Sequence, residues 1–304
     1  MSELVLHHYA MSPYAEKIRL CLGLKGLAWR SVDTPMVMPK PDHLELTGGY
    51  RRVPVLQVGA DIYCDTACIA RELDRRFPQS PLYPPGQETI AHSLCQWSET
   101  TFMMVVLAFF GIGGVFPPEF VEDRRKTMVT PGTNLDGAAL VLPTKLVQIQ
   151  ANLDRLEALL ADGREFLLGD TPCVSDAAAC HPLLFLGSQP RTAALLEPRK
   201  AVAAWLERMK RLGRGRPSPL SAADAIAIAR AADPEPFDGE LVLPEGIALG
   251  APVVVLPDEY GSGKVAGALA PSGLHEIAVR RESERAGTLV VHFPRETYAV
   301  IATG

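Results

Sequence analysis

Apolar and polar positions in the first 77 residues follow two periods, and each period predicts a different kind of element. Together they predict strands at 3–9 and 27–33, a β-hairpin over 53–64, and helices at 14–26 and 65–77. A strand–helix–strand half is thus followed by a hairpin–helix half. This order predicts a compact α/β domain with a thioredoxin-like sheet over residues 1–77.

A proline-rich segment at 78–87 reads as a linker, because proline suits neither a helix interior nor a central strand. Beyond it the apolar period is helical, and it predicts helices at 88–110, 142–163, 174–188, 198–213 and 221–232. In the second of these helices, a buried stripe is expected at Leu146, Ile149, Leu153, Leu156, Leu159 and Leu160. We therefore predict an all-helical domain over residues 88–232.

The period changes again after a second proline- and glycine-rich segment at 233–246. Short β-like runs follow at 251–256, 264–270, 275–281, 287–293 and 297–303. The sequence GSGK at 261–264 lacks the earlier glycine of a phosphate-binding loop and predicts a hairpin turn instead. Five such runs suit a small antiparallel, barrel-like β domain over residues 240–304.

Composition narrows the class of protein. The 304 residues are 47% hydrophobic and 21% charged with a net charge of −5, which is typical of a soluble protein and leaves no basic surface for nucleic acid. Six cysteines without metal-ligand spacing predict reduced thiols, a cytoplasmic location and no metal. The apolar run at 102–116 is shorter than the roughly 20 residues of a membrane span, so we expect a buried helix or a pocket wall and no membrane association. The N-terminus lacks the pattern of a secretory signal.

Ser12 stands between the first strand and the first helix, and Pro13 follows it. Proline is favoured at the first helical position, so Ser12 is predicted to be the N-cap. The same helix start attracts negative charge, because its N–H groups are unpaired and the helix dipole is positive there. From these residues alone, capping fully explains the serine, and anion handling remains an alternative.

The segment 51–78 resembles the glutathione-binding half of the glutathione transferase superfamily, with Ser12 and Pro13 at the matching place upstream. The family pattern is a Val-Pro pair before the hairpin, followed by an acidic and a hydroxyl residue that open the next helix. Here these pairs are Val53-Pro54 and Asp65-Thr66. The resemblance implies glutathione as co-substrate and a homodimer. The C-terminal β region lies outside the usual two-domain pattern.

The resemblance also implies a role for each matched residue. Pro54 should follow a cis peptide bond that turns the backbone of Val53 toward the peptide-like middle of glutathione. Asp65 and Thr66 should receive the γ-glutamyl end, although the usual family residues are Glu-Ser and aspartate is shorter by one methylene. Lys40 and Arg52 could neutralise the glycine carboxylate, or they could be solvated surface charges.

Ser12 matches the catalytic serine or cysteine of the classes that do not use a tyrosine, and its implied role is to donate a hydrogen bond to the glutathione sulfur. A cysteine would favour disulfide exchange, whereas serine favours conjugation, isomerisation or reduction. Tyr9 and Tyr14 are competing donors. Cys173 and Asp176 match the family's helix-starting box, with cysteine replacing the usual hydroxyl cap.

We therefore expect a glutathione transferase-like detoxification enzyme that activates the thiolate for attack on a small apolar electrophile in a cleft between the first two domains. Candidate electrophile contacts, for which core packing or a dimer face is the alternative, are Tyr14, Met103, Met104, Phe109 and Phe110. Two other functions stay open. The chain could be a non-catalytic binding or scaffold protein with the same fold, or a thiol or peroxide reductase that works through a cysteine.

Overall fold

The computed structural model describes residues 3–128, 135–258 and 263–303. The chain divides into two compact units, each described by itself below. The first comprises Met1–Ala15, Ala28–Glu72 and Arg216–Gly304, and the second comprises Glu16–Leu27 and Leu73–Gly215. Helix α1 (Pro13–Leu24) begins in the first unit and continues into the second.

The first unit is built on a single sheet, which has ten strands among the described residues, in the order β10-β6-β7-β8-β9-β4-β3-β1-β2-β5. The strands are β1 (Leu4–His8), β2 (Ala28–Asp33), β3 (Val55–Val58), β4 (Asp61–Cys64), β5 (Arg216–Pro219), β6 (Pro252–Pro257), β7 (Val265–Ala270), β8 (Glu276–Ser283), β9 (Gly287–Pro294) and β10 (Tyr298–Ala302). The unit also contains α2 (Pro41–Thr47), most of α3 (Thr66–Arg76), α10 (Ala222–Arg230) and the 3₁₀ turn Arg295–Thr297.

The N-terminal part of this sheet is the predicted thioredoxin-like arrangement. Strand β1 runs parallel to β2 and antiparallel to β3, which forms the predicted hairpin with β4. His7 and His8 point to opposite faces of β1, since His7 hydrogen-bonds Gln57 at 2.8 Å and His8 hydrogen-bonds Ser31 at 2.9 Å. Helix α2 was not predicted, because its seven residues are too few for a helical period to stand out.

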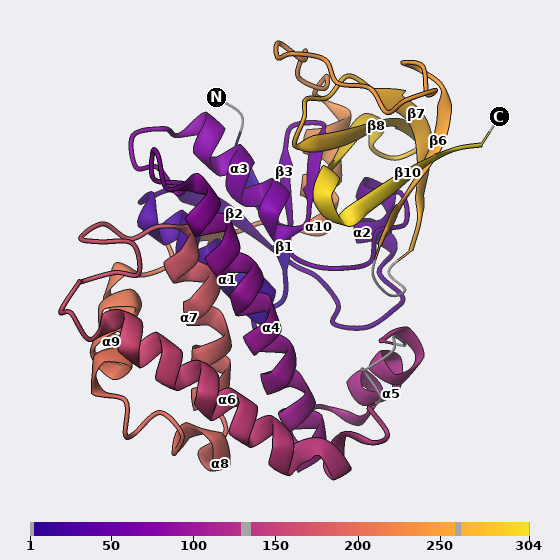
Figure 1. Ribbon diagram of the computed structural model, residues 1–304. Coiled ribbons are helices and arrows are strands. Elements are labelled where there is room, and N and C mark those ends of the chain that lie inside the picture. The colour runs from indigo at the N-terminus through magenta and orange to yellow at the C-terminus, as the bar shows by residue number, and fades with distance from the viewer. Residues whose placement is uncertain (1–2, 129–134, 259–262, 304) are drawn as a thin grey trace. The chain divides into compact units, whose positions relative to one another are not determined.

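The five C-terminal strands, orange and yellow in Figure 1, are those that the sequence predicted, and they are antiparallel to one another. They do not form a sheet of their own, however, because β9 pairs in parallel with β4. Without β9, β4 would be an edge strand with unpaired backbone groups, although all four of its residues are buried. The predicted turn at 261–264 lies partly outside the described residues.

One core cluster unites the two parts of the sheet. It contains Ile62 and Cys64 of β4 together with Leu289, Val291 and Phe293 of β9, all essentially buried. Helix α10 adds two residues to this core, Ile226 and Ala229. The sequence predicts this helix within the 88–232 helical domain, but its apolar face is buried against the sheet, and residues from Arg216 onward belong to the first unit.

The second unit is helical. Its helices are the C-terminal part of α1, α4 (Glu88–Ile112), α5 (Pro118–Thr127), α6 (Ala138–Leu160), α7 (Val174–Gly187), α8 (Pro190–Ala193) and α9 (Lys200–Leu212). Helix α4 packs against α6 and α7, and α6 packs against α9. The predicted stripe on α6 is largely confirmed, since its fully buried members are Ile149, Leu153, Leu156 and Leu160.

Helix α4 is, within the described residues, the one helix whose length and composition would suffice to cross a bilayer, a test that buried core helices also pass. Its aromatic residues have partners inside the unit. Phe109 and Phe102 pack against Phe185 of α7, with ring centroids 4.4 and 6.2 Å apart. The predicted buried helix over 102–116 is therefore confirmed as far as Ile112, where α4 ends.

The box at the start of α7 is also present. The Asp176 carboxylate accepts hydrogen bonds from the backbone N–H of Cys173 at 3.0 Å and of Leu167 at 3.0 Å, and from the indole N–H of Trp205 at 2.8 Å. Burial raises the pKa of Asp176 despite these donors. Asp176 thus connects the start of α7 to the segment at Leu167 and to α9 at Trp205. The sequence indicated only its contact at the helix start.

Candidate functional site

Ser12 is the N-cap of α1, as the sequence predicted. Its hydroxyl oxygen accepts a hydrogen bond from the backbone N–H of Ala15 at 3.2 Å, and its own N–H donates to the carbonyl of Tyr9 at 3.1 Å. The side chain is only 3% exposed. A hydroxyl that accepts from the backbone keeps its own hydrogen as a donor, so capping and donation to an anion are compatible in one residue.

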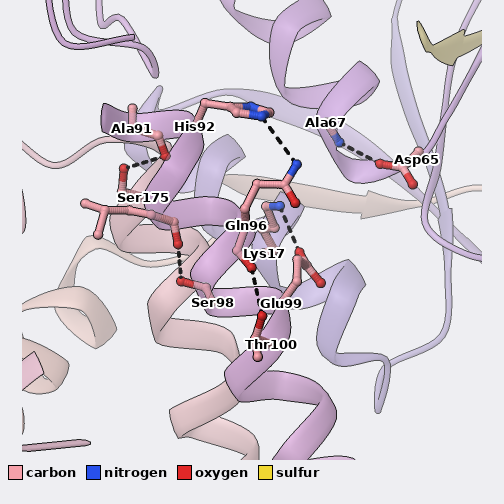
Figure 2. Close-up of polar contacts among 11 residues, drawn as sticks. Lys17, Asp65, Ala67, Ala91, His92, Gln96, Ser98, Glu99, Thr100 and Ser175 are labelled. Atoms are coloured by element: carbon pink, nitrogen blue, oxygen red, sulfur yellow. Dashed lines mark hydrogen bonds and ion pairs between the residues drawn. The ribbon is translucent and has the colours of Figure 1, made fainter. Parts of the chain in front are cut away.

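Helix α1 is anchored beyond its first turn, within the second unit. Lys17 pairs with Glu99 of α4 at 3.4 Å, which Figure 2 shows, and Lys25 pairs with Asp74 at 2.8 Å. Both ammonium groups are nearly inaccessible to solvent. These contacts restrain α1 from Lys17 onward, within the second unit.

The peptide bond between Val53 and Pro54 is cis, which confirms the expectation drawn from the resemblance. Strand β3 begins directly after it, and Val55 lies opposite both His7 of β1 and Cys64 of β4. The loop that contains Ser12 follows β1, and Asp65 follows β4. The antiparallel register therefore brings Ser12, Pro54 and Asp65 to one end of three adjacent strands.

Asp65 opens α3 in an unusual backbone conformation, with a φ of 74°. Aspartate is among the few residues that tolerate this left-handed region. One carboxylate oxygen, Oδ1, accepts the backbone N–H of Ala67 at 2.9 Å, as Figure 2 shows at the start of the helix. Thr66 is the first residue of α3 and is buried.

Helix α2 holds the segment that precedes the cis bond through three donors. The Lys40 ammonium donates to the carbonyl of Arg51 at 3.1 Å, and the Thr47 hydroxyl donates to the carbonyl of Tyr50 at 2.8 Å. The third donor is Nε2 of His43, 3.0 Å from the carbonyl of Arg52.

Two of these residues change the sequence-based picture. Lys40 is 2% exposed, with its ammonium 5.9 Å from the ring centroid of Tyr9, so it is not the solvated surface charge that was its alternative. His43 was not singled out from the sequence. Burial, followed by the charges of His7 and Lys40, lowers its pKa to about 3, so the ring is neutral and acts through its N–H. Arg52 is partly exposed.

A residue from the C-terminal strands also reaches this end of the sheet. The hydroxyl of Tyr298, the first residue of β10, donates to Oδ2 of Asp65 at 3.5 Å. Sequence reasoning missed this contact, because residues 65 and 298 meet only through the pairing of β9 with β4. The one available signal was an aromatic residue at the buried start of the last predicted strand.

The candidate electrophile contacts separate by burial. Tyr14, Met103, Met104 and Phe110 are partly exposed, as is Tyr9, which was predicted only as a competing donor to the glutathione sulfur. Phe109 is fully buried on the face of α4 that packs against Phe185. Its expected role as a substrate contact is therefore replaced by the alternative, core packing.

The cysteines are free, and none is an activated thiol. Cys21, Cys64, Cys68, Cys173 and Cys180 are buried, and Cys95 is partly buried. Burial raises the pKa of each thiol, to about 12 for Cys21 and Cys173, and the charge of Asp65 raises that of Cys64 further. In the part of the chain that the structure describes, no three metal-binding side chains gather into a group.

Known proteins match this chain in both units. The family model described as glutathione S-transferase, N-terminal domain, matches residues 6–81, and that of the glutathione S-transferase C-terminal domain matches residues 139–208. A GST-like protein from Pseudomonas syringae is 40% identical, with a TM-score of 0.82 and coverage of 100% of both chains. That match therefore includes the C-terminal strands.

Two further solved structures share the fold. Poplar glutathione transferase F1 is 13% identical, with a TM-score of 0.54 over 70% of this chain and 97% of its own. FzlA from C. crescentus is 24% identical, with a TM-score of 0.51 over 68% of this chain and 88% of its own. With a whole-length relative at 40% identity and both domain models matched, the chain belongs to the glutathione transferase superfamily.

Proposed function

We propose that this protein binds glutathione at one end of its sheet and uses Ser12 to stabilise the glutathione thiolate for attack on a small apolar electrophile. The observation that carries the proposal is the convergence of three features at that end. These are the N-cap hydroxyl of Ser12, the cis bond before Pro54, and the capped start of α3 at Asp65.

The helix start and the hydroxyl together supply enough stabilisation for the thiolate. A free thiol with a pKa near 8.5 is only about 3% ionised at pH 7, and lowering that pKa by two units takes roughly 2.7 kcal/mol. A charge-assisted hydrogen bond contributes about 1.5 to 3 kcal/mol, and a favourable helix N-terminus contributes up to about 2 kcal/mol. Ser12 would combine both, without a metal or a histidine base.

The rest of glutathione would bind residues at the same end of the sheet. The backbone of Val53 would pair with its peptide-like middle. Asp65 would receive the γ-glutamyl ammonium, and the N-terminus of α3 at Thr66 would receive the γ-glutamyl carboxylate. Lys40 and Arg52 would face the glycine carboxylate.

The proposed electrophile contacts are the partly exposed residues Tyr14, Met103, Met104 and Phe110. By analogy with the family, we propose a cytoplasmic homodimer with a role in detoxification. Light scattering of the purified chain would test the dimer directly. A reductase that works through cysteine is disfavoured, because the thiols are buried and their pKa values are raised.

The test measures the thiol pKa of bound glutathione. The ultraviolet absorbance of the thiolate is recorded as a function of pH. Ser12→Gly removes the hydroxyl at a cost of only a few tenths of a kcal/mol to the cap, and Ser12→Thr keeps both functions. We expect Ser12→Gly to raise the apparent thiol pKa toward 8.5 and to slow conjugation across a panel of electrophiles, and Ser12→Thr to resemble the wild type. An unchanged thiol pKa in Ser12→Gly would transfer the role to Tyr9 or Tyr14. Binding without conjugation of any electrophile would favour the non-catalytic scaffold.

A further inference from the structure

The Asp65 carboxylate is held at both oxygens by groups from different parts of the chain. Oδ1 accepts the N–H of Ala67, which is two residues away, at 2.9 Å. Oδ2 accepts the hydroxyl of Tyr298, which is 233 positions away, at 3.5 Å. A carboxylate has about four lone-pair sites, so these two donors orient the group and still leave it able to accept a ligand ammonium.

Tyr298 is itself fixed by packing. Its side chain is 4% exposed, and its ring lies 5.0 Å from that of Phe293 and 6.4 Å from that of Tyr50, between centroids. Its backbone is paired with Pro257 of β6. Burial, the charges of Tyr50 and Asp65, and a side-chain hydrogen bond with Tyr50 raise the pKa of Tyr298 well above its usual value, so the hydroxyl stays protonated throughout the physiological range.

The same C-terminal strands contact α2, the helix that follows Lys40. The Arg281 guanidinium of β8 donates to the carbonyl of Glu45 at 2.5 Å, and Arg285 pairs with Asp42 at 2.7 Å. The Ser283 hydroxyl donates to the Glu45 carboxylate. The C-terminal β region thus contacts α2, which follows Lys40, and Asp65, which directly precedes α3.

We propose that Tyr298 is a positioning residue for glutathione, and that its hydroxyl holds the Asp65 carboxylate in the orientation that receives the γ-glutamyl ammonium. This inference rests on the function proposed above. The C-terminal strands then serve substrate recognition, a role beyond the usual two-domain pattern. The Tyr298 hydroxyl matters here because aspartate is one methylene shorter than the usual glutamate. A misoriented Asp65 carboxylate could therefore move less far toward the ligand ammonium.

The test uses the full-length chain and the variant Tyr298→Phe, which keeps the ring and removes the donor. We expect the dissociation constant and the KM for glutathione to rise about three- to tenfold, with kcat at saturating glutathione changed less than about twofold. A second ligand, glutaryl-cysteinyl-glycine, is glutathione without the α-amino group. It should bind the wild type and Tyr298→Phe equally well.

Two measurements separate positioning from a packing effect. In an Asp65→Asn background, Tyr298→Phe should have no further effect on glutathione affinity. A loss of packing would instead weaken both ligands alike and would persist in that background, and either result would overturn the inference. If the wild type binds glutathione and Tyr298→Phe binds it equally well, the inference fails and the proposed function stands. If the wild type does not bind glutathione, the proposed function fails as well.

Discussion

At the scale of single residues, Asp65 combines three demands that few side chains meet together. Its backbone is left-handed, its side chain caps α3, and its charge is proposed to bind an ammonium. Asparagine keeps the left-handed backbone and the cap with its one oxygen, lacks the charge, and would turn its amide N–H₂ toward Tyr298, whose hydroxyl can accept as well as donate. Comparing Asp65 with Asp65→Asn therefore separates an effect on glutathione binding from an effect on folding.

We predict that Asp65→Asn leaves the melting temperature nearly unchanged and weakens glutathione binding about tenfold or more, because a hydrogen bond to a charged group contributes roughly 1.5 to 3 kcal/mol. Calorimetric titration would measure the affinity, and circular dichroism would measure the melting temperature. Asp65→Val serves as the contrast, since a β-branched residue is strained at this φ and should lower stability. Equal glutathione affinity in wild type and Asp65→Asn would contradict the role of the charge.

Asp176 shows how a short motif can carry more than its pattern indicates. We predict that Asp176→Ala lowers the free energy of unfolding by about 3 to 5 kcal/mol, because three buried N–H donors lose their acceptor at once. Urea denaturation would measure the loss. Cys173→Ser is the control within the same box, and it should be neutral or slightly stabilising because serine is a better cap. A loss below about 1 kcal/mol in Asp176→Ala would show that water replaces the acid.

At the scale of elements, the pairing of β4 with β9 is reinforced by one histidine. Nε2 of His292 lies 2.9 Å from the Asp61 carboxylate, and Nδ1 lies 2.8 Å from the Glu276 carboxylate of β8. The ring stacks on Tyr63 with centroids 4.3 Å apart. Burial alone would lower the pKa of His292, but the hydrogen bonds and charges of the two acids outweigh it and raise the pKa to about 9.

This raised pKa predicts the pH dependence of stability. The folded-state pKa lies above the unfolded value of about 6.5, so the contribution is fully present below about pH 6.5 and is lost as the pH rises through about 9. His292→Phe keeps a ring beside Tyr63 and removes both ion pairs. We expect it to lower the free energy of unfolding by about 3 to 5 kcal/mol near pH 6, and by clearly less near pH 10. A difference between wild type and variant that stays constant with pH would rule out a charged imidazole.

The elements also show what sequence patterns could and could not supply. Ser12 as a cap and the helix start at Asp65-Thr66 were predictable from neighbouring residues, whereas the cis bond before Pro54 was predicted from the resemblance to the glutathione transferase superfamily. The pairing of Ile62 with Val291 was not, since local alternation marks a strand and not its partner. The Tyr298 contact depends on that pairing and was hidden with it. His43 was hidden for another reason, because nothing in its short helix marks it as buried.

At the scale of the whole molecule, the C-terminal strands are part of the core of the first unit. We predict that a chain ending at residue 239 does not melt cooperatively and aggregates at micromolar concentration. Removing β6 to β10 would expose the edge of β4 and the apolar residues Ile62 and Cys64. Light scattering and a thermal melt would test this. A soluble, cooperatively melting shortened chain that still bound glutathione would show that the N-terminal strands suffice.

The pairing of β4 with β9 also affects the order in which the chain folds during synthesis. Asp61 of β4 and His292 of β9 are 231 positions apart, so β4 leaves the ribosome long before β9 is synthesised. The entropy of closing so long a loop grows only slowly with length, but distant contacts slow folding, and an unpaired edge promotes association between nascent chains. The helical unit ends at Gly215 and is fully synthesised before β6 begins. The fold is thus completed from its C-terminus, and the sheet that begins the chain is the last part to close.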